Sequence, residues 1–310
     1  MQSPAEGVAV TSVSVVIPVR NGARYIAEAI RSALAQGDFI TELVVVDDAS
    51  TDGTAEVALS IGDPRVRVVP NGATGLPAGR NTGTAHSSGT WLYYLDSDDR
   101  VRPGAVAALL AAARRTPSAD VVYGDYERVD VHGRRIGRRG AIRFRRKPTG
   151  YILPALLKGN FMVAGAQIVR RAAFERAGGF DESLRCLEDW HFWCRVSSFA
   201  EFLHVPGCHV LDYRIHNASM MHAAPRPFSD FRPAIDAVYG DPMVAKRMSP
   251  LALAGLRPIA EASLMAYVAT EAIRLRAYGT AARSALRAAW HAPTQTPKVV
   301  ARVLGTFAGL

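Results

Sequence analysis

The first part of the chain alternates short, continuous apolar runs with segments whose apolar residues recur every three or four positions. The continuous runs predict strands over 13–19, 42–48, 65–70, 91–96 and 121–126. The periodic segments predict helices over 23–36, 52–61, 77–88 and 103–115. Because continuous apolar strands are buried on both faces, the alternation indicates an α/β fold, a doubly wound and mostly parallel sheet with helices on both faces.

The pattern changes after residue 126. A basic connector is followed by a short helix that ends at Gly178–Gly179, a Trp-rich helix near 187–198, and strands near 201–205 and 209–214. From about residue 230, Ala, Leu and Arg recur at helical spacing. We therefore expect an α/β domain over 1–228, with halves at about 12–125 and 126–228. A C-terminal α-helical extension over 229–310 should follow, and its apolar stripe is expected to serve packing.

Composition is that of a folded protein, with 49% hydrophobic and 21% charged residues among 310. The 37 Lys and Arg exceed the 28 Asp and Glu, and the net charge of +9 favours anionic partners. Three cysteines are too few for a disulfide framework, and the N-terminus lacks a secretory pattern. No uncharged apolar run reaches the roughly 18 residues of a membrane span. We expect a cytoplasmic protein, with peripheral attachment to the inner face of the cell membrane left open.

Three aspartates, Asp96, Asp98 and Asp99, follow the apolar run of the strand at 91–96. Such a cluster is a solvated turn, a set of caps for the helix that Pro103 opens, or a site for a hard cation. A cap needs only one acid, whereas alternating carboxylates can direct two oxygens at one Mg²⁺ or Mn²⁺ ion. The cluster therefore predicts a divalent-metal site.

Asp47 and Asp48 end another predicted strand, and in a parallel sheet they would face the same crevice. A carboxylate at such a place is suited to accept hydrogen bonds from the base or ribose of a nucleoside. The alternative is that this loop only caps the next helix. Ser50, Thr51 or Asp52 can do that, which leaves Asp48 available for a ligand.

Four segments in order resemble the motifs of family 2 glycosyltransferases, which are inverting enzymes with the fold called GT-A. The segments are SVVIPVRNGARYIAEAIRSALAQ, ELVVVDDASTDGT, GLPAGRNTGTAHSSGTWLYYLDSDDRV and GGFDESLRCLEDWHFWCRV, and the match extends over residues 13 to about 216. The resemblance implies transfer of a sugar from a nucleoside-diphosphate donor to a hydroxyl group, with a divalent metal as cofactor.

The resemblance also implies roles for individual residues. The end of the first strand would line the nucleotide site, Asp48 would contact the nucleobase, and the RN pair Arg80–Asn81 would lie near the nucleotide. The residues assigned to the nucleotide sugar are Pro18, Val19, Arg20, Asn21, Asp48, Arg80, Asn81, Asp96, Ser97 and Asp98. The metal candidates are Asp96, Asp98, Asp99 and His216, and which two aspartates hold the ion stays open.

The second half should supply the general base. Inverting transfer needs a carboxylate near the acceptor hydroxyl, and Asp189 matches the aspartate of the family's ED pair. The aromatic neighbours Trp190 and Trp193 could exclude water and so raise the pKa of Asp189. For Trp193, stacking on a sugar ring and a place in the core are both open. Glu188 and Arg214 are further acceptor or phosphate candidates, although Glu188 could be an ordinary helix N-terminal acid. His216 could be a plain loop histidine.

Other function classes fit less well. A sugar-nucleotide nucleotidyltransferase would need a Gly-rich basic loop after the first strand, and PVRNGARY is a poor version of one. A catalytically inactive carbohydrate-binding relative would not need to retain Asp48, the aspartate cluster and Asp189 together. An NAD-linked enzyme or a Ser-His-Asp hydrolase would need G-x-G-x-x-G or G-x-S-x-G, and both are absent.

The sequence leaves several classes of donor, acceptor and other partner open. The donor could carry UDP, dTDP or GDP, and the acceptor could be a glycan or a lipid-linked glycan of cell-surface polysaccharide or glycoconjugate synthesis. The basic segment 134–147 could meet a polyanionic glycan, a lipid-linked pyrophosphate or a membrane, whereas nucleic acid is the weaker expectation. The C-terminal helices could dock on a membrane or form a homo-oligomer.

Overall fold

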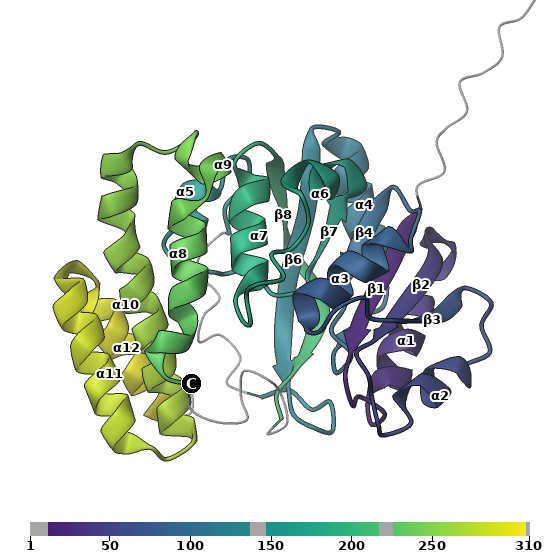
Figure 1. Ribbon diagram of the computed structural model, residues 1–310, viewed down its shortest axis with the longest axis horizontal. Coiled ribbons are helices and arrows are strands. Elements are labelled where there is room, and N and C mark those ends of the chain that lie inside the picture. Colours follow the sequence, from purple (N-terminus) through teal and green to yellow (C-terminus); the bar gives the residue numbers. More distant parts are fainter. Residues whose placement is uncertain (1–11, 137–146, 217–225, 308–310) are drawn as a thin grey trace, which may run out of the picture.

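An eight-stranded sheet forms the centre of the protein (Figure 1). The computed structural model describes residues 12–136, 147–216 and 226–307. The strands lie in the order β3-β2-β1-β4-β7-β6-β8-β5. Their bounds are β1 Val13–Val19, β2 Ile40–Asp47, β3 Val66–Pro70, β4 Trp91–Tyr94, β5 Arg100–Val101, β6 Ala119–Val129, β7 Gln167–Arg170 and β8 Glu201–Arg214.

Most of the sheet is parallel. β1 pairs in parallel with β2 and β4, β2 with β3, and β6 with β8. β7 runs antiparallel to β4 and β6, and β5 runs antiparallel to β8. Since β7 separates β4 from β6, those two strands point the same way, and the carboxyl ends of β1, β2, β4 and β8 share one edge of the sheet. The predicted fold class is confirmed.

Helices cover both faces of the sheet. On one face, α1 (Ile26–Leu34), α2 (Thr54–Leu59) and α4 (Ala105–Arg115) pack against the side chains of Val15 and Ile17. On the other lie α3 (Leu76–Ala85), α5 (Leu153–Leu156), α6 (Arg171–Ala177) and α7 (Glu188–Ser197). α3 packs this close to β1 because Gly83 has no side chain: a Cβ at that position would lie 2.3 Å from Val16 Cγ1. Burial on both faces explains the unbroken apolar run of β1.

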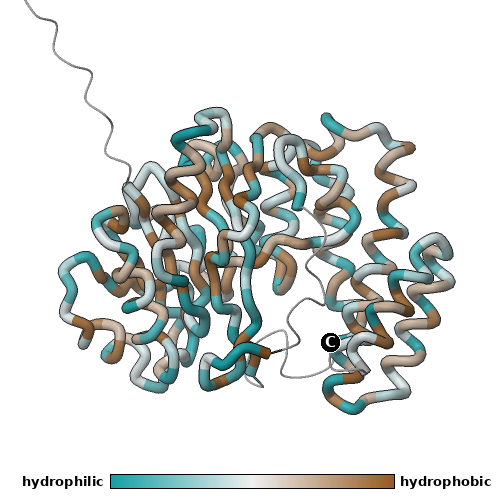
Figure 2. The backbone as a smooth tube through the Cα atoms, turned by 180° about the vertical axis from the view of Figure 1, so that it is seen from behind, coloured by the Kyte–Doolittle hydropathy of each residue, from teal (hydrophilic) through white to brown (hydrophobic). Residues whose placement is uncertain are grey.

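The C-terminal helices continue the second face sideways (Figure 1). They comprise α8 (Arg232–Gly240), α9 (Pro242–Ala245), α10 (Pro250–Arg274), α11 (Tyr278–His291) and α12 (Thr296–Phe307), preceded by a 3₁₀ turn at Phe228–Phe231. α8 packs on α7, α10 packs on α8, and α11 and α12 pack on α10. Figure 2 shows hydrophobic residues along the central strands and a mixture of hydrophobic and hydrophilic residues along α10 to α12.

Helix α10 has the length and composition of a membrane-spanning helix, alone among the helices that the structure describes. Its buried residues include Ala260, Leu264 and Val268, which belong to the same apolar core as Trp190 of α7. Length and composition are therefore weak evidence of a span, because a core helix meets the same criteria.

Two local predictions differ from the structure. The strands predicted near 201–205 and 209–214 are one strand, β8, because Gly207, with φ +74, lets the chain bulge against β6 without ending the pairing. The short strands β5 and β7 were not predicted, because runs of two and four residues give too little pattern. Residues 137–146 of the predicted basic segment lie outside the described residues.

Candidate active site

The loops after β1 and β2 are joined by hydrogen bonds at the carboxyl edge of the sheet. Asn21, in a left-handed conformation with φ +52, donates its backbone N–H to Ser50 Oγ at 2.9 Å and accepts from Thr51 N at 2.8 Å. The β1 loop also reaches the aspartate cluster, since a Cβ at Gly22 would lie 3.3 Å from Ser97 Oγ. The structure thus brings the predicted segments Pro18–Asn21 and Asp96–Asp98 together, with Arg20 exposed to solvent.

Asp48 lies at the same edge and organises a further loop. Its carboxylate accepts hydrogen bonds from Asn71 Nδ2 at 3.1 Å and from Gly75 N at 3.0 Å. The segment between β3 and α3 is therefore folded back onto the end of β2. Sequence reasoning missed Asn71, although an Asn-Gly pair directly after a predicted strand marks a turn that could reach back to the sheet.

The three clustered aspartates have different environments. Asp99 is 1% exposed, and its Oδ1 accepts a hydrogen bond from Arg214 N at 2.7 Å, while Oδ2 is buried without a hydrogen-bond partner. Burial, together with the charges of Asp98 and Asp96, raises the pKa of Asp99 well above its ordinary value. Asp96 and Asp98 keep part of their surface exposed. Asp99 therefore points into the protein, and its neighbours face outward.

Asp98, in the loop after β4, is in contact with His216. His216 follows β8, and its Nε2 lies 2.8 Å from Asp98 Oδ2. Its ring also lies 5.3 Å from that of Tyr25, measured between centroids. The predicted metal candidates from two distant segments are thus in direct contact.

Within the described part of the chain, no group of three His, Cys, Asp or Glu side chains is arranged to hold a metal ion. The partly exposed Asp98 carboxylate is the type of ligand that Mg²⁺ and Mn²⁺ take, since such ions bind one or two carboxylates and complete their coordination with phosphate oxygens and water. His216 Nε2, 2.8 Å from Asp98 Oδ2, is within hydrogen-bond distance of that carboxylate, and an imidazole is a softer ligand than these hard ions prefer.

A buried arginine joins the two halves of the site. Arg80, 2% exposed on α3, donates from Nη2 to Asp96 Oδ1 at 3.0 Å and from Nη1 to Glu188 Oε1 at 2.5 Å. Its guanidinium also lies 5.3 Å from the ring centroid of Phe180. Burial raises the pKa of Asp96, and the charge of Arg80 opposes that effect. The aspartate cluster is therefore tied to the start of α7.

The neighbouring Asn81 is hydrogen-bonded within the protein. Its Nδ2 donates to Phe180 O at 2.9 Å and to Glu182 Oε1 at 2.8 Å, and its Oδ1 accepts from Phe180 N at 2.9 Å. Both polar atoms of its side chain bind the loop before α7, and its place near the nucleotide stays a prediction. It fixes the loop that leads to Glu188.

Asp189 stands in the first turn of α7, where the preceding Leu187 has a left-handed φ of +57. Its Oδ1 accepts a hydrogen bond from Trp190 N at 2.7 Å, and its Oδ2 accepts one from Asn160 Nδ2 at 3.0 Å. Burial raises the pKa of Asp189 to about 7, the charge of Glu188 adds to the rise, and Arg80 and both hydrogen bonds oppose it. A carboxyl group with this pKa can exchange a proton near neutral pH.

Asn160 is a site residue that sequence reasoning missed. Its Oδ1 accepts the backbone N–H of Met162 at 3.0 Å, so its amide group is oriented with Nδ2 toward Asp189. An asparagine in a loop 29 residues before its partner carries no local pattern that would single it out.

The tryptophans of α7 belong to the core. Trp190 is fully buried, and its Nε1 donates to Leu156 O at 2.8 Å. Trp193 is 1% exposed and packs edge-on against Phe202, with ring centroids 6.2 Å apart. Neither side chain presents a surface on which an acceptor could lie, so for Trp193 the core alternative holds and stacking on a sugar is excluded. Their bulk does contribute to the burial of α7.

Glu188 and Arg214 are also buried and bonded to other protein groups. Glu188 is buried against Arg80. Arg214 is 3% exposed. Its guanidinium donates to Asp98 O at 2.7 Å and to Glu28 Oε2 at 2.7 Å, and it lies over the ring of Tyr25. Both were predicted as acceptor or phosphate candidates, and in this structure their polar atoms bind protein groups, so an acceptor or phosphate contact at either residue stays a prediction. Arg214 holds the loop that carries Asp98.

Sequence comparison matches residues 14–178 to the sequence model described as glycosyl transferase family 2. The succinoglycan biosynthesis protein ExoO of Rhizobium meliloti is 33% identical over 190 residues, which cover 58% of this chain and 54% of that protein. Chondroitin synthase of Escherichia coli is 30% identical over 197 residues, which cover 62% of this chain and 27% of the enzyme. The chain thus spans about half or less of the length of these relatives.

Structural comparison finds a similar architecture in S. aureus TarS 1-349. Its complex with UDP-GlcNAc superimposes with a TM-score of 0.62, covering 96% of this chain and 89% of that one. The sequences are 18% identical, so this likeness concerns the fold. It extends beyond the range of the family match into the C-terminal helices.

Proposed function

Since the chain belongs to glycosyl transferase family 2, we propose that it transfers a sugar from a nucleoside-diphosphate donor to an acceptor hydroxyl, with inversion and with a divalent metal. Family membership makes it a glycosyltransferase. The donor, the stereochemistry, the metal and the acceptor are the finer parts of the proposal. The catalytic domain would extend over 1–228, and 229–310 would be a helical extension.

The observation that carries the proposal is the Arg80 bridge. One guanidinium contacts Asp96, two residues before Asp98, and Glu188, the neighbour of Asp189. One buried side chain therefore holds the loop that carries Asp98 close to the start of α7, which carries Asp189. This supports the proposal, because in-line displacement needs the base and the leaving group near each other, at opposite ends of the reacting bond.

On the donor side, Asp98 and His216 would hold a Mg²⁺ or Mn²⁺ ion. The ion, when bound, would neutralise the negative charge that the leaving nucleoside diphosphate gains. Arg214 keeps the Asp98 loop in place through the backbone carbonyl of Asp98. Asp48 and the loop that it binds would form the edge nearest the nucleobase.

On the acceptor side, Asp189 would accept the proton of the attacking hydroxyl. The hydroxyl oxygen forms the new bond to the anomeric carbon, and the bond from that carbon to the diphosphate breaks. A base with a pKa of about 7 is deprotonated in a useful fraction of molecules at neutral pH. Asn160 would orient the accepting carboxylate.

The names of the similar proteins support a choice of donor nucleotide and acceptor for the proposed reaction. TarS is crystallised with UDP and with UDP-GlcNAc, and ExoO and chondroitin synthase are named for polysaccharide synthesis. We therefore place UDP ahead of dTDP and GDP, and a glycan of a cell-surface polysaccharide or glycoconjugate as the acceptor. The reaction would take place in the cytoplasm or at the inner face of the cell membrane.

Calorimetric titration with UDP, dTDP and GDP, each with and without Mn²⁺, tests the donor side. We expect metal-enhanced binding of one nucleotide, UDP before the others. If no nucleotide bound more tightly with metal, the metal-dependent donor site would be refuted. Release of pyrophosphate from a nucleoside triphosphate and a sugar 1-phosphate, with no release of nucleoside diphosphate from a sugar nucleotide, would indicate a nucleotidyltransferase.

A further inference from the structure

One face of α11 is exposed and carries both bulky apolar and cationic side chains. Arg283, Leu286, Arg287 and Trp290 stand at positions i, i+3, i+4 and i+7, which align on one side of a helix. Leu286 is 71% exposed and Trp290 is 88% exposed. We call these four residues the α11 stripe. Two large apolar side chains that are this exposed on one face form an apolar patch, and such patches mark interaction surfaces.

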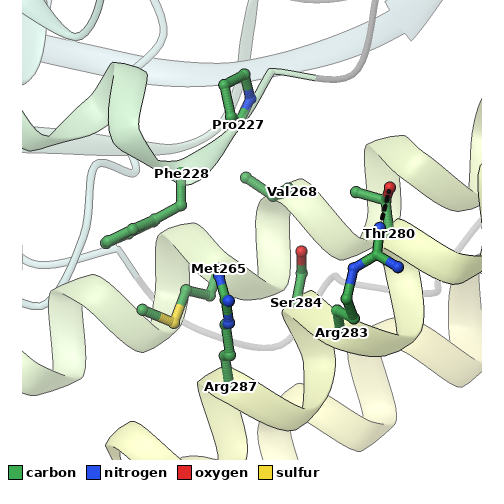
Figure 3. Close-up of a pocket in the computed structure, with 8 residues that line it drawn as sticks. All are labelled: Pro227, Phe228, Met265, Val268, Thr280, Arg283, Ser284 and Arg287. Carbon is green, nitrogen blue, oxygen red and sulfur yellow. Dashed lines mark hydrogen bonds between the residues drawn. The ribbon is translucent and has the colours of Figure 1, made fainter.

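The stripe borders an open groove between α11, α10 and the turn before α8. The groove has a volume of about 690 Å³; Phe228 and Met265 line it together with Leu286 and Trp290, and Arg232 and Arg287 add cationic groups. A smaller hollow of about 150 Å³ adjoins it and shares Phe228, Met265 and Arg287; Arg287 lies beside Met265, and Arg283 lies near Thr280 at the other end (Figure 3). Apolar lining with arginines beside it suits a ligand that is apolar at one end and anionic at the other.

The charges of this region have one sign. The segment from 272 to 310 contains Arg274, Arg276, Arg283, Arg287, Lys298 and Arg302 and no Asp or Glu. The acid that lines the groove, Glu261, is paired with Arg257 at 3.0 Å and with His291. An anionic partner is therefore attracted over the whole of α11 and α12.

We propose that the α11 stripe binds an anionic phospholipid bilayer, with Trp290 and Leu286 at the level of the lipid headgroups and Arg283 and Arg287 on the phosphates. Exposed Trp and Leu beside arginines on one helix are the features of an interfacial membrane helix. A two-fold symmetric dimer through the same stripe would gather the arginines of both copies into one interface, and the stripe has no Asp or Glu to pair with them, which disfavours that occupant.

Trp290 provides a direct probe. The chain has four tryptophans, and the other three, Trp91, Trp190 and Trp193, are at most 4% exposed. Changes in tryptophan fluorescence and in quenching by acrylamide therefore report Trp290. With vesicles of phosphatidylglycerol and phosphatidylcholine at low salt, we expect a blue shift and protection from the quencher. Vesicles of phosphatidylcholine alone should produce neither.

Sedimentation with the same vesicles tests the contributions of the stripe. The double variant R283Q/R287Q should bind roughly 30-fold more weakly, as expected from about 1 kcal/mol for each arginine near an anionic surface. L286S/W290S should also lose binding. Leu251→Ser, at a leucine that is 84% exposed on the first turn of α10, is the matched control and should bind as the parent does. Unchanged thermal midpoints would show that the variants fold.

Two results would overturn the proposal. One is equal binding to neutral and anionic vesicles, or to neither. The other is a lipid-independent dimer in sedimentation velocity that Trp290→Ser dissociates, since the stripe would then bind a second copy. Sugar transfer to a soluble acceptor is measured without vesicles, so failure of the membrane proposal and failure of the proposed activity are distinguishable.

Discussion

Arg80 and Glu188, which are 108 residues apart in the chain, form a buried ion pair with 2.5 Å between Nη1 and Oε1. Arg80 lies in α3 and Glu188 in α7, and neither side chain is more than 6% exposed. Because Arg80 also holds Asp96, its planar guanidinium sets the position of the aspartate cluster relative to α7. This pair is thus a structural connection between the two proposed halves of the chemistry.

Replacing Arg80 by methionine should destabilise the protein strongly. The buried carboxylate of Glu188 and the partly exposed one of Asp96 would lose their cation, and breaking a buried pair typically costs about 3–5 kcal/mol. Urea unfolding measures the loss, and Arg114→Met, at an exposed position in the last turn of α4, is the control. Adding Glu188→Gln to Arg80→Met should recover part of the stability. If the double variant were less stable than the single one, Glu188 would have a partner other than Arg80.

Asp189→Asn should abolish transfer and leave nucleotide affinity unchanged. The amide keeps the shape of the side chain but cannot take the proton from the hydroxyl group. In the parent enzyme, kcat/KM should fall about tenfold per pH unit below the pKa of about 7 and level off above it, because only the ionised carboxylate is active. Equal loss of nucleotide binding and of transfer would mean that Asp189 belongs to the donor site.

Asn160 should shift this pH dependence. Its Nδ2 stabilises the ionised form of Asp189, so Asn160→Ala should raise the pKa of Asp189 and move the profile to higher pH. Asn160→Asp places a second acid beside the base and should move the profile further. Rates measured across pH 6–10 separate two roles. A shifted profile with an unchanged plateau indicates control of the pKa, and a lower plateau without a shift indicates that Asn160 only positions the carboxylate.

Asp98 and His216 should determine the metal dependence of donor binding. Asp98→Asn and His216→Ala are each expected to weaken nucleotide binding in Mn²⁺ at least tenfold, a loss typical of residues that support a metal site. Neither should change the weaker binding measured with a chelator. His132→Ala, at an exposed histidine outside the site, is the control. If the two variants reduced binding equally with and without metal, the pair would contact the nucleotide itself.

The sequence predicted the sheet well because its strands are buried on both faces. The runs of β1 and β2 are too long and apolar for any other role, and helices with clear periodicity separate them. The antiparallel strand β7, which inserts between β4 and β6, could not be predicted. Its position depends on pairing with residues that are 44 to 79 positions away in the chain, and that pairing leaves no mark on its own four residues.

The sequence predicted which residues form the site more reliably than it predicted how their side chains are oriented. The sequence located the acidic loop and the start of α7, but it could not indicate that Asp99 points inward to Arg214 N while Asp98 meets His216. Trp190 and Trp193 show the same limit, since aromatic residues suit both a sugar ring and a core. Packing against β6, β8 and the C-terminal helices, which lies outside any local pattern, placed both of them in the core.

Glu42 should make the stability of the protein depend on acid. It accepts hydrogen bonds from Ser14 Oγ at 2.6 Å, Arg67 Nη2 at 2.6 Å and Ser88 N at 2.5 Å. Burial raises its pKa, but these hydrogen bonds outweigh burial and lower the pKa from 4.5 to about 2. A pKa that is lower in the folded state stabilises folding above pH 4.5, and this contribution disappears as the pH falls toward 2.

Glu42→Gln should therefore lower the free energy of unfolding at pH 7, by on the order of 2 kcal/mol after allowance for solvent screening. The difference from the parent should shrink between pH 4.5 and 2, where the parent carboxylate takes up a proton as well. Denaturant unfolding at a series of pH values measures this difference, with Glu56→Gln on the exposed surface of α2 as the control. A difference that stayed constant down to pH 2 would show that Glu42 acts through its shape and neutral hydrogen bonds, because loss of charge could not then explain the destabilisation.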